Sequence, residues 1–315
     1  MIAQKISVEE LQCSPLPTLK ISGVSNFDVS KTFDCGQAFR FDRVTNSLHD
    51  NEFAGCAHGK YVSFAQDGDT LYIYNATKDD YFEIWEHYLA LDLDYEEINR
   101  DILSLSDNPT LKEAVNASSG IRILKQDPWE AVCSFIISQN NNIPRIKKIV
   151  ADLCYKCGEK ADVLHMSDHI ADLHREREGN FYSFPTPESV REIGTDGLFA
   201  LKTGFRAKYI YDAADKVARN EIDLSALENL DTTAECAATL CQIKGVGPKV
   251  AACALLFGFG RLDAFPIDVW IKKVMAKYFS EDFDPNTLGR YAGIAQQYLF
   301  YYERYLINEK GENKK

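Results

Sequence analysis

The fold of the C-terminal half is decided by the stretch Leu240-Cys241-Gln242-Ile243-Lys244-Gly245-Val246-Gly247-Pro248-Lys249. Two glycines two residues apart let backbone N–H groups approach an oxyanion closely. A proline is accepted in a first helical turn because its missing N–H has no intrahelical partner there. The stretch therefore predicts a helix, a hairpin and a second helix, in which Gly245, Val246 and Gly247 grip a phosphate.

An amine and a carboxylate follow this hairpin. Lys249 lies in the first turn of the second helix, and Asp268 follows in Phe265-Pro266-Ile267-Asp268-Val269-Trp270. The positive end of a helix dipole disfavours an ammonium. An amine nucleophile that attacks a sugar carbon would need this setting and a carboxylate nearby. Asp268 could also be only a helix cap and Lys249 only a phosphate contact, but the two together with the hairpin favour catalysis.

The composition is that of a globular protein. The chain has 315 residues, of which 45% are hydrophobic and 26% charged. No apolar run approaches the ~18 residues that span a membrane, and the start has no apolar signal segment. Nine cysteines without a regular framework fit reduced thiols in a cytosol. We therefore expect a cytoplasmic protein.

The net charge of −12 is unevenly distributed. Residues 1–118 carry 9 basic and 20 acidic side chains, whereas residues 240–279 carry 6 basic and 2 acidic ones. Nucleic acid responds to a local patch more than to the total charge. The acidity therefore does not exclude DNA as a partner, although it argues against strong non-specific binding.

The pattern changes from strands to helices along the chain. Lys60–Phe64 and Thr70–Tyr74 alternate around an Asp67-Gly68-Asp69 turn, and Ala38–Phe41 and Phe53–Cys56 are similar. From about residue 79 the pattern is helical, with helix starts at Asp127-Pro128 and Thr186-Pro187, and with Asp231 as the cap of a helix that runs to Ile243. We predict an α+β chain of three parts: 1–118, an N-terminal antiparallel sheet domain with flanking helices; 119–305, a helical domain with the helix-hairpin-helix at 232–258; and 306–315, a polar tail.

Several motifs resemble one family. The stretch from Gly245 to Asp268 looks like that of the helix-hairpin-helix glycosylase superfamily, and specifically of the 8-oxoguanine DNA glycosylases. In that family the N-terminal sheet domain is TBP-like. The other motifs occur in the same order between about Leu11 and Tyr305. They are Asp34–Arg40, which resembles the glycine loop; Gln126–Glu130 with Ser138–Arg145, the asparagine-rich element; Leu201–Tyr209, the intercalating loop; and Ala295–Phe300, the pocket helix.

The resemblance implies a pocket for a flipped base. The main-chain carbonyl of Gly36 would accept the N7–H that distinguishes 8-oxoguanine from guanine. Cys253 and Phe300 would sandwich the base, and Gln296 would read its Watson–Crick edge. Phe257 would form part of the pocket wall.

The resemblance also implies contacts with the rest of the duplex. Asn140, with Asn141 beside it, would fill the gap left by the flipped base. Arg145 and Arg206 would hold the orphaned cytosine, and Phe205 would wedge beside it. Taken singly, Asn140 to Asn142 could be only a helix-ending turn, Phe300 only a core aromatic and Arg206 only a phosphate contact at a helix start.

The activity that follows is that of a bifunctional DNA glycosylase and AP lyase in base excision repair. Lys249 would attack C1′ while Asp268 stabilises the developing charge, and the resulting Schiff base permits β-elimination. We expect double-stranded DNA with 8-oxoguanine opposite cytosine as partner, a monomer, no organic cofactor and no catalytic metal. One alternative is a monofunctional glycosylase for another damaged purine, but such an enzyme should lack a nucleophilic lysine such as Lys249. The other is a non-catalytic helix-hairpin-helix DNA-binding module.

Some positions depart from the family pattern. Trp270 stands where many members have a histidine, Gln139 replaces a small polar residue, and Phe257 replaces a methionine. We therefore expect weaker selectivity for cytosine than in stricter members. Cys154 and Cys157, with His165, His169 and His174, also raise a zinc hypothesis, but their spacing is too short for a usual finger and favours a polar surface loop.

Overall fold

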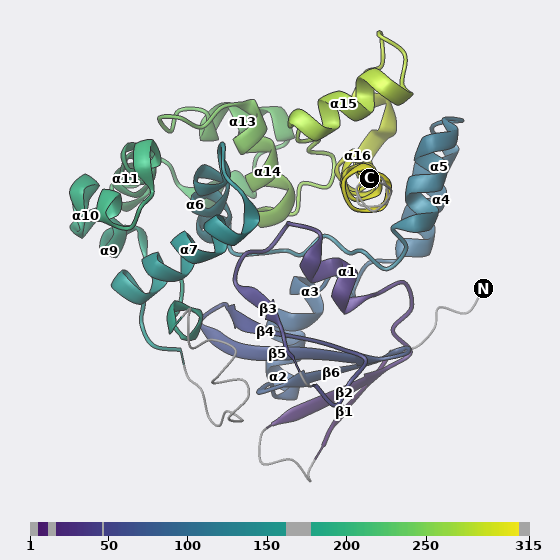
Figure 1. Cartoon of the computed structure of the whole chain (residues 1–315), viewed down its shortest axis with the longest axis horizontal. Helices are drawn as coiled ribbons and strands as arrows, with labels where there is room; N and C mark the ends of the chain where they lie inside the picture. Colours follow the sequence, from purple (N-terminus) through teal and green to yellow (C-terminus); the bar gives the residue numbers. More distant parts are fainter. Residues whose placement is uncertain (1–5, 12–16, 46, 162–177, 309–315) are drawn as a thin grey trace.

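The computed structural model describes residues 6–11, 17–45, 47–161 and 178–308. Its N-terminal part is an antiparallel sheet of six strands in the order β1-β2-β6-β5-β4-β3. The strands are β1 (Ser7–Glu10), β2 (Thr18–Ser22), β3 (Phe41–Arg43), β4 (Asn51–Ala57), β5 (Lys60–Asp67) and β6 (Thr70–Tyr74). The sheet lies on one side of the molecule and most of the helices lie on the other (Figure 1).

Two short hairpins fix the register at the centre of the sheet. Asp67 pairs with Thr70, which leaves a two-residue turn where the sequence predicted one. At the other end of β5, His58 and Gly59 have φ of 50° and 72°, and the twist of such a turn matches that of the flanking strands. The predicted strands at 60–64, 70–74 and 53–56 are confirmed.

The segment before β3 differs from the prediction. We expected a strand from Ala38 to Phe41, but β3 begins only at Phe41, which pairs with Gly55. A helix, α1 (Val29–Asp34), precedes this segment, and its cap Asp28 accepts a hydrogen bond from the Lys31 N–H. The chain between α1 and β3 turns inward to contact the helices, so its backbone pairs with no strand.

Helices make up most of the remaining chain. The α-helices are α2 (Lys78–Asp80), α3 (Glu86–Tyr88), α4 (Tyr95–Ser104), α5 (Pro109–Ala117), α6 (Pro128–Ser138), α7 (Ile143–Cys157), α9 (Pro187–Glu192), α10 (Gly194–Ala200), α11 (Ala207–Ala218), α12 (Leu224–Leu227), α13 (Thr233–Leu240), α14 (Pro248–Gly258), α15 (Val269–Tyr278) and α16 (Ala292–Tyr301). Short 3-10 turns occur at η2 (Glu178–Phe181), η3 (Gly204–Arg206) and η4 (Pro285–Tyr291), and π-helical turns at η1 (Tyr81–Trp85) and η5 (Tyr302–Asn308). No helix in these described ranges is long and apolar enough to cross a membrane.

Helix caps follow the sequence at two places and differ at a third. Asp127 and Thr186 cap α6 and α9, each followed by proline, as predicted. The prediction of Asp231 as a cap is wrong, because Thr232 caps α13 and forms a reciprocal capping box with Glu235. That box satisfies two terminal N–H groups at once, which a lone aspartate does not. The helix also ends at Leu240 rather than at Ile243.

Two main hydrophobic cores hold these layers together. One lies between the sheet and the α1 and η1–α3 segments, where the rings of Phe33 and Phe64 stack at 5.3 Å. The larger core joins α4–α7, α11, α13, α14 and α16. It also takes in Cys35 and Phe39 from the segment after α1, so the glycine loop is anchored among the helices. The division of the chain at residue 118 stays a prediction.

The zinc hypothesis is not tested by this structure. Cys154 is buried and Cys157 is half-buried at the end of α7. The three histidines of the hypothesis, His165, His169 and His174, lie outside the described residues.

Candidate active site

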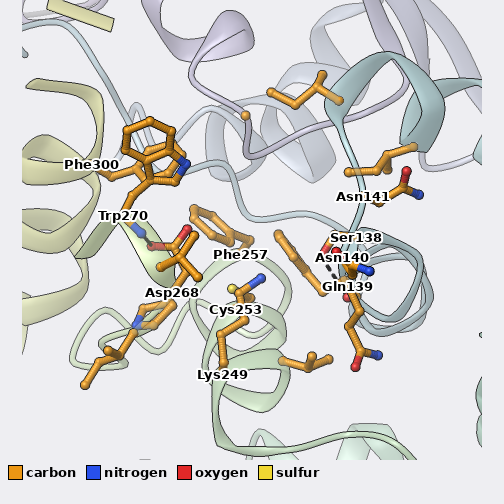
Figure 2. Close-up of a pocket in the computed structure, with 18 of the residues that line it drawn as sticks. Ser138, Gln139, Asn140, Asn141, Lys249, Cys253, Phe257, Asp268, Trp270 and Phe300 are labelled. Carbon is orange, nitrogen blue, oxygen red and sulfur yellow. Dashed lines mark hydrogen bonds between the residues drawn. The ribbon is translucent and has the colours of Figure 1, made fainter. Parts of the chain in front are cut away.

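A cavity of about 650 Å³ opens between the helices and the loop that follows α1. α14 lines it along one side, the start of α15 and the pocket helix α16 along another, and the α6–α7 connection opposite them. Figure 2 shows Lys249 and Cys253 between Asp268 and the Ser138–Asn141 segment. The cavity therefore gathers residues from segments more than 200 positions apart in the sequence, from Gly36 to Phe300.

The hairpin before α14 is held rigidly. Gly245 has φ of 80°, and a Cβ there would lie 2.4 Å from the Tyr209 ring, so only glycine fits. From α11, Asp212 accepts a hydrogen bond from the Lys244 N–H at 2.7 Å, and Lys216 donates to the Gln242 carbonyl at 2.6 Å. The N-cap of α14 is a glycine, so no side chain caps the helix. The first N–H groups of α14 are thus left for an anion from outside.

Lys249 faces an aromatic wall and a thiol. Its Nζ lies 5.9 Å from the centre of the Phe135 ring, and that ring stacks on Phe257 at 5.3 Å. Cys253 lies one turn further along α14. Burial raises the pKa of the Cys253 thiol to about 11, and the positive charge of Lys249 opposes this shift. Cys253 is therefore a neutral, polarisable face rather than a nucleophile.

Asp268 has the cap position that the sequence allowed. Its Oδ1 accepts hydrogen bonds from the N–H groups of Trp270 at 2.9 Å and Ile271 at 2.8 Å. These two bonds fix the carboxylate at the start of α15, on the rim of the cavity. Among the described residues no ion pair joins Asp268 to Lys249. The negative charge is thus held in place without being neutralised by the amine.

The predicted base-pocket residues all line this cavity. Gly36, Cys253, Phe257, Gln296 and Phe300 do so from three separate segments. Gln296 is only 4% exposed, and its Oε1 has no hydrogen-bond partner among the described residues. A buried amide oxygen without a partner is costly. A base edge that donates a hydrogen bond would relieve that cost.

The opposite-base residues form a second group beside the cavity. Asn140 and Asn141 line it, but Arg145, Phe205 and Arg206 do not. Arg206 is buried, and its guanidinium donates to the main-chain carbonyls of Gln139 and Asn140. Phe205 is 52% exposed, with the Arg206 guanidinium 4.5 Å from its ring centre. Arg206 therefore holds the Asn140 turn, which has a left-handed φ of 48°.

Two residues that line the cavity, Phe135 and Arg304, were missed by the sequence analysis. Phe135 lies on α6 with ordinary core spacing, and only the packing of α6 against α14 places it beside Lys249. Arg304 lies on the same side of the cavity as Phe300, with its guanidinium 5.4 Å from that ring centre. Its spacing of four from Phe300 was the one available signal.

Comparisons with known proteins agree with this arrangement. Residues 20–132 match the 8-oxoguanine DNA glycosylase N-terminal domain, and residues 133–288 match the HhH-GPD superfamily base excision DNA repair protein. The chain is 38% identical to MBOgg1, solved in complex with a low affinity DNA ligand, over 98% of this chain and 99% of that one, with a TM-score of 0.82.

Two further relatives extend the comparison. The Clostridium acetobutylicum 8-oxoguanine glycosylase/lyase, solved with double-stranded DNA containing cytosine opposite 8-oxoG, is 34% identical over 98% of this chain and 99% of that one, with a TM-score of 0.81. The Saccharomyces cerevisiae N-glycosylase/DNA lyase is 31% identical over 64% of this chain. That match spans about half of the yeast protein, 52% of its length.

Proposed function

The chain belongs to the 8-oxoguanine DNA glycosylase family, and we propose that it excises 8-oxoguanine from duplex DNA and then cleaves the strand as an AP lyase. One observation carries the proposal. A single cavity holds an amine at a helix N-terminus, a fixed carboxylate and a slot for a planar base, formed by Lys249, Asp268, Cys253, Gln296 and Phe300.

The base would enter this slot from the duplex. Flipping costs a few kcal/mol, and less for a damaged base. Cys253 and Phe300 offer two faces between which a base can lie, and the unpartnered Oε1 of Gln296 accepts from its Watson–Crick edge. The Gly36 carbonyl accepts the N7–H. Guanine has an acceptor at N7 instead, so its lone pair would face that carbonyl.

The chemistry follows from the two charged groups. Lys249 first loses its ammonium proton to solvent and attacks C1′ of the deoxyribose with the Nζ lone pair. The N–C1′ bond forms as the C1′–N9 bond breaks, and its electron pair leaves on the base, which takes a proton from water. Asp268 stabilises the positive charge that develops on the sugar. The product is an alkylammonium bonded to C1′. A proton then moves from this nitrogen to O4′ as the C1′–O4′ bond breaks, which opens the sugar ring and gives a protonated Schiff base. Loss of a proton from C2′ then breaks the C3′–O bond and cleaves the strand by β-elimination.

The rest of the duplex would bind along the hairpin and the asparagine turn. Gly245, Val246 and Gly247 present the uncapped start of α14 to a phosphate. Asn140 and Asn141 fill the gap in the stack, with Phe205 as a wedge beside it. We propose cytosine as the preferred opposite base, which Arg145 and Arg206 hold, and a monomer as the working form.

The experiment that tests this function compares opposite bases. A duplex with one 8-oxoguanine opposite each of the four bases is incubated with excess enzyme, and base release and strand cleavage without alkali are followed. We expect release fastest opposite cytosine, with cleavage following. Absence of base release from all four duplexes would contradict the proposal.

A further inference from the structure

The loop that carries Gly36 has an unusual pattern of main-chain acceptors. Gly36 lines the cavity with φ of 85°, and a Cβ there would lie 3.4 Å from Cδ1 of Ile143. Its carbonyl accepts no hydrogen bond from the residues that the structure describes. The carbonyls on either side, those of Cys35 and Gln37, both accept one from a buried glutamine.

The two donors come from different parts of the chain. Nε2 of Gln297 donates to the Cys35 carbonyl at 3.1 Å, and Nε2 of Gln126 donates to the Gln37 carbonyl at 2.8 Å. Both donors are largely buried, with Gln297 3% and Gln126 6% exposed. Water therefore cannot replace these bonds easily, and each one fixes the peptide plane next to Gly36.

Each glutamine also ties the loop to one wall of the base slot. Gln297 follows Gln296 on α16, the helix that also carries Phe300. The main-chain N–H of Gln126 donates to the Phe257 carbonyl near the end of α14 at 2.9 Å, and α14 also carries Cys253. The loop is thus joined to both helices between which a base would lie.

The side chain of Gln37 also holds the loop in place. Its amide donates to the carbonyls of Thr32 and Arg122, each at 2.8 Å, and its Oε1 accepts from the Leu124 N–H at 2.9 Å. Of the three successive carbonyls from Cys35 to Gln37, that of Gly36 is thus the one that no donor among the described residues occupies, and Gly36 itself lines the cavity.

We propose that Gln297 and Gln126 are positioning residues for the recognition of 8-oxoguanine at its N7–H. They hold the Gly36 carbonyl where the N7–H of the lesion meets it. This inference rests on the proposed function. At N7, 8-oxoguanine differs from guanine by one hydrogen bond, the one that its N7–H donates to the Gly36 carbonyl. The position of that carbonyl therefore sets the selectivity. Both glutamines act through Gly36 and not on the base.

The test uses the full chain with Gln297→Met, which keeps the length of the side chain and removes its donor. Two single-turnover rates are measured: release of 8-oxoguanine opposite cytosine, and cleavage at a preformed abasic site in the same duplex. An abasic site has no base for Gly36 to read. We expect base release to fall at least about tenfold more than abasic-site cleavage, because a small displacement of a positioned group has large kinetic effects. Gln126→Met is the independent second variant, with the same expectation.

A matched control is Gln66→Met. Gln66 is 7% exposed and its side chain makes three hydrogen bonds in the sheet domain, away from the cavity. The Gln66→Met variant should have a lower melting temperature but an unaltered ratio of base release to abasic-site cleavage. The inference would be overturned if the ratio of base release to abasic-site cleavage were unchanged in both Gln297→Met and Gln126→Met. It would also be overturned if Gln66→Met changed this ratio equally. A wild-type protein that cleaves the abasic duplex but releases no 8-oxoguanine would overturn the proposed function and the inference with it.

Discussion

Lys249 points its amine at the ring of Phe135, with 5.9 Å between Nζ and the ring centre. Phe135 in turn stacks on Phe257 with an angle of 22° between the ring planes. The nucleophile therefore lies against a flat apolar wall built from two helices, α6 and α14. Such a wall limits the positions of a long flexible side chain and keeps water from one side of the amine.

The first prediction concerns this wall. Phe135→Leu conserves most of the volume, so the free energy of unfolding should fall by less than about 1.5 kcal/mol. The rate of Schiff-base formation should fall about tenfold, because the amine loses its fixed position and its cation–π contact. Rapid-quench trapping under single-turnover conditions measures this rate. Phe64→Leu in the sheet core is the control, and equal rates in both variants would refute the role of the wall.

Asp268 gives a prediction that separates capping from catalysis. Asparagine caps a helix as well as aspartate does, so Asp268→Asn should leave stability within about 0.5 kcal/mol, whereas Asp268→Ala should cost about 1 kcal/mol. Both variants lose the charge, so both should lose at least about 100-fold in the rate of base release. Thermal unfolding and single-turnover excision together make the comparison.

The same pair of substitutions at Asp94 is the control for Asp268. Asp94 caps α4 by accepting from the N–H groups of Glu96 and Glu97, and it does not line the cavity. The alanine variant should again cost stability, but neither variant should slow excision. Near wild-type excision by Asp268→Asn would show that Asp268 is a cap alone.

A buried acid on α6, Glu130, predicts a pH dependence of stability. Burial raises the pKa of Glu130 from 4.5 to about 7, although Arg40, with Nη1 3.4 Å from Oε2, opposes the shift. At a pH between these two pKa values, Glu130 is protonated in the folded state but has lost its proton in the unfolded chain. The contribution of Glu130 to stability is therefore present below pH 4.5 and is lost as the pH rises through about 7.

Urea unfolding of wild type and Glu130→Gln at pH 5 and pH 8 tests this sign. The glutamine does not titrate, so wild type should lose free energy of unfolding relative to Glu130→Gln at the higher pH. A difference between the two proteins that is the same at both pH values would contradict the raised pKa.

Phe205 predicts an effect on binding without an effect on folding. Its side chain is 52% exposed, and its ring lies edge-on to that of Tyr209, with 5.8 Å between the ring centres. Phe205→Ala should change stability by less than about 1 kcal/mol but weaken binding to an abasic-site duplex about tenfold, since stacking of a base on an aromatic ring contributes ~1–3 kcal/mol. Fluorescence anisotropy measures the affinity. Phe199→Ala, at a ring that is 64% exposed on α10, should bind normally, and equal weakening in both would exclude a wedge role.

The sequence predicted the parts of the site that depend on local rules. The Gly-Val-Gly hairpin needs a left-handed glycine at residue 245, and a proline such as Pro248 is favoured in the first turn of a helix. The β5–β6 hairpin likewise follows from the Gly68-Asp69 turn between alternating residues. These features depend on a few neighbouring residues, so a sequence pattern can identify them.

Features set by distant contacts were not predictable in this way. The chain at Ala38–Arg40 has strand-like residues, but contacts with the helices draw it away from the sheet. Nothing in the sequence indicated that the donors of Arg206 meet the carbonyls of the asparagine turn in the protein without DNA. Each depends on a partner from another segment, as does the place of Phe135 beside Lys249.

The most direct test of the central claim is borohydride trapping on a duplex with one 8-oxoguanine opposite cytosine. Wild type and Lys249→Gln are compared, because glutamine is similar in length but has no nucleophilic amine. The account predicts a covalent protein–DNA adduct from wild type and none from Lys249→Gln. Release of the base by wild type without any adduct, or equal adducts from the two proteins, would contradict the assignment of Lys249 as the nucleophile.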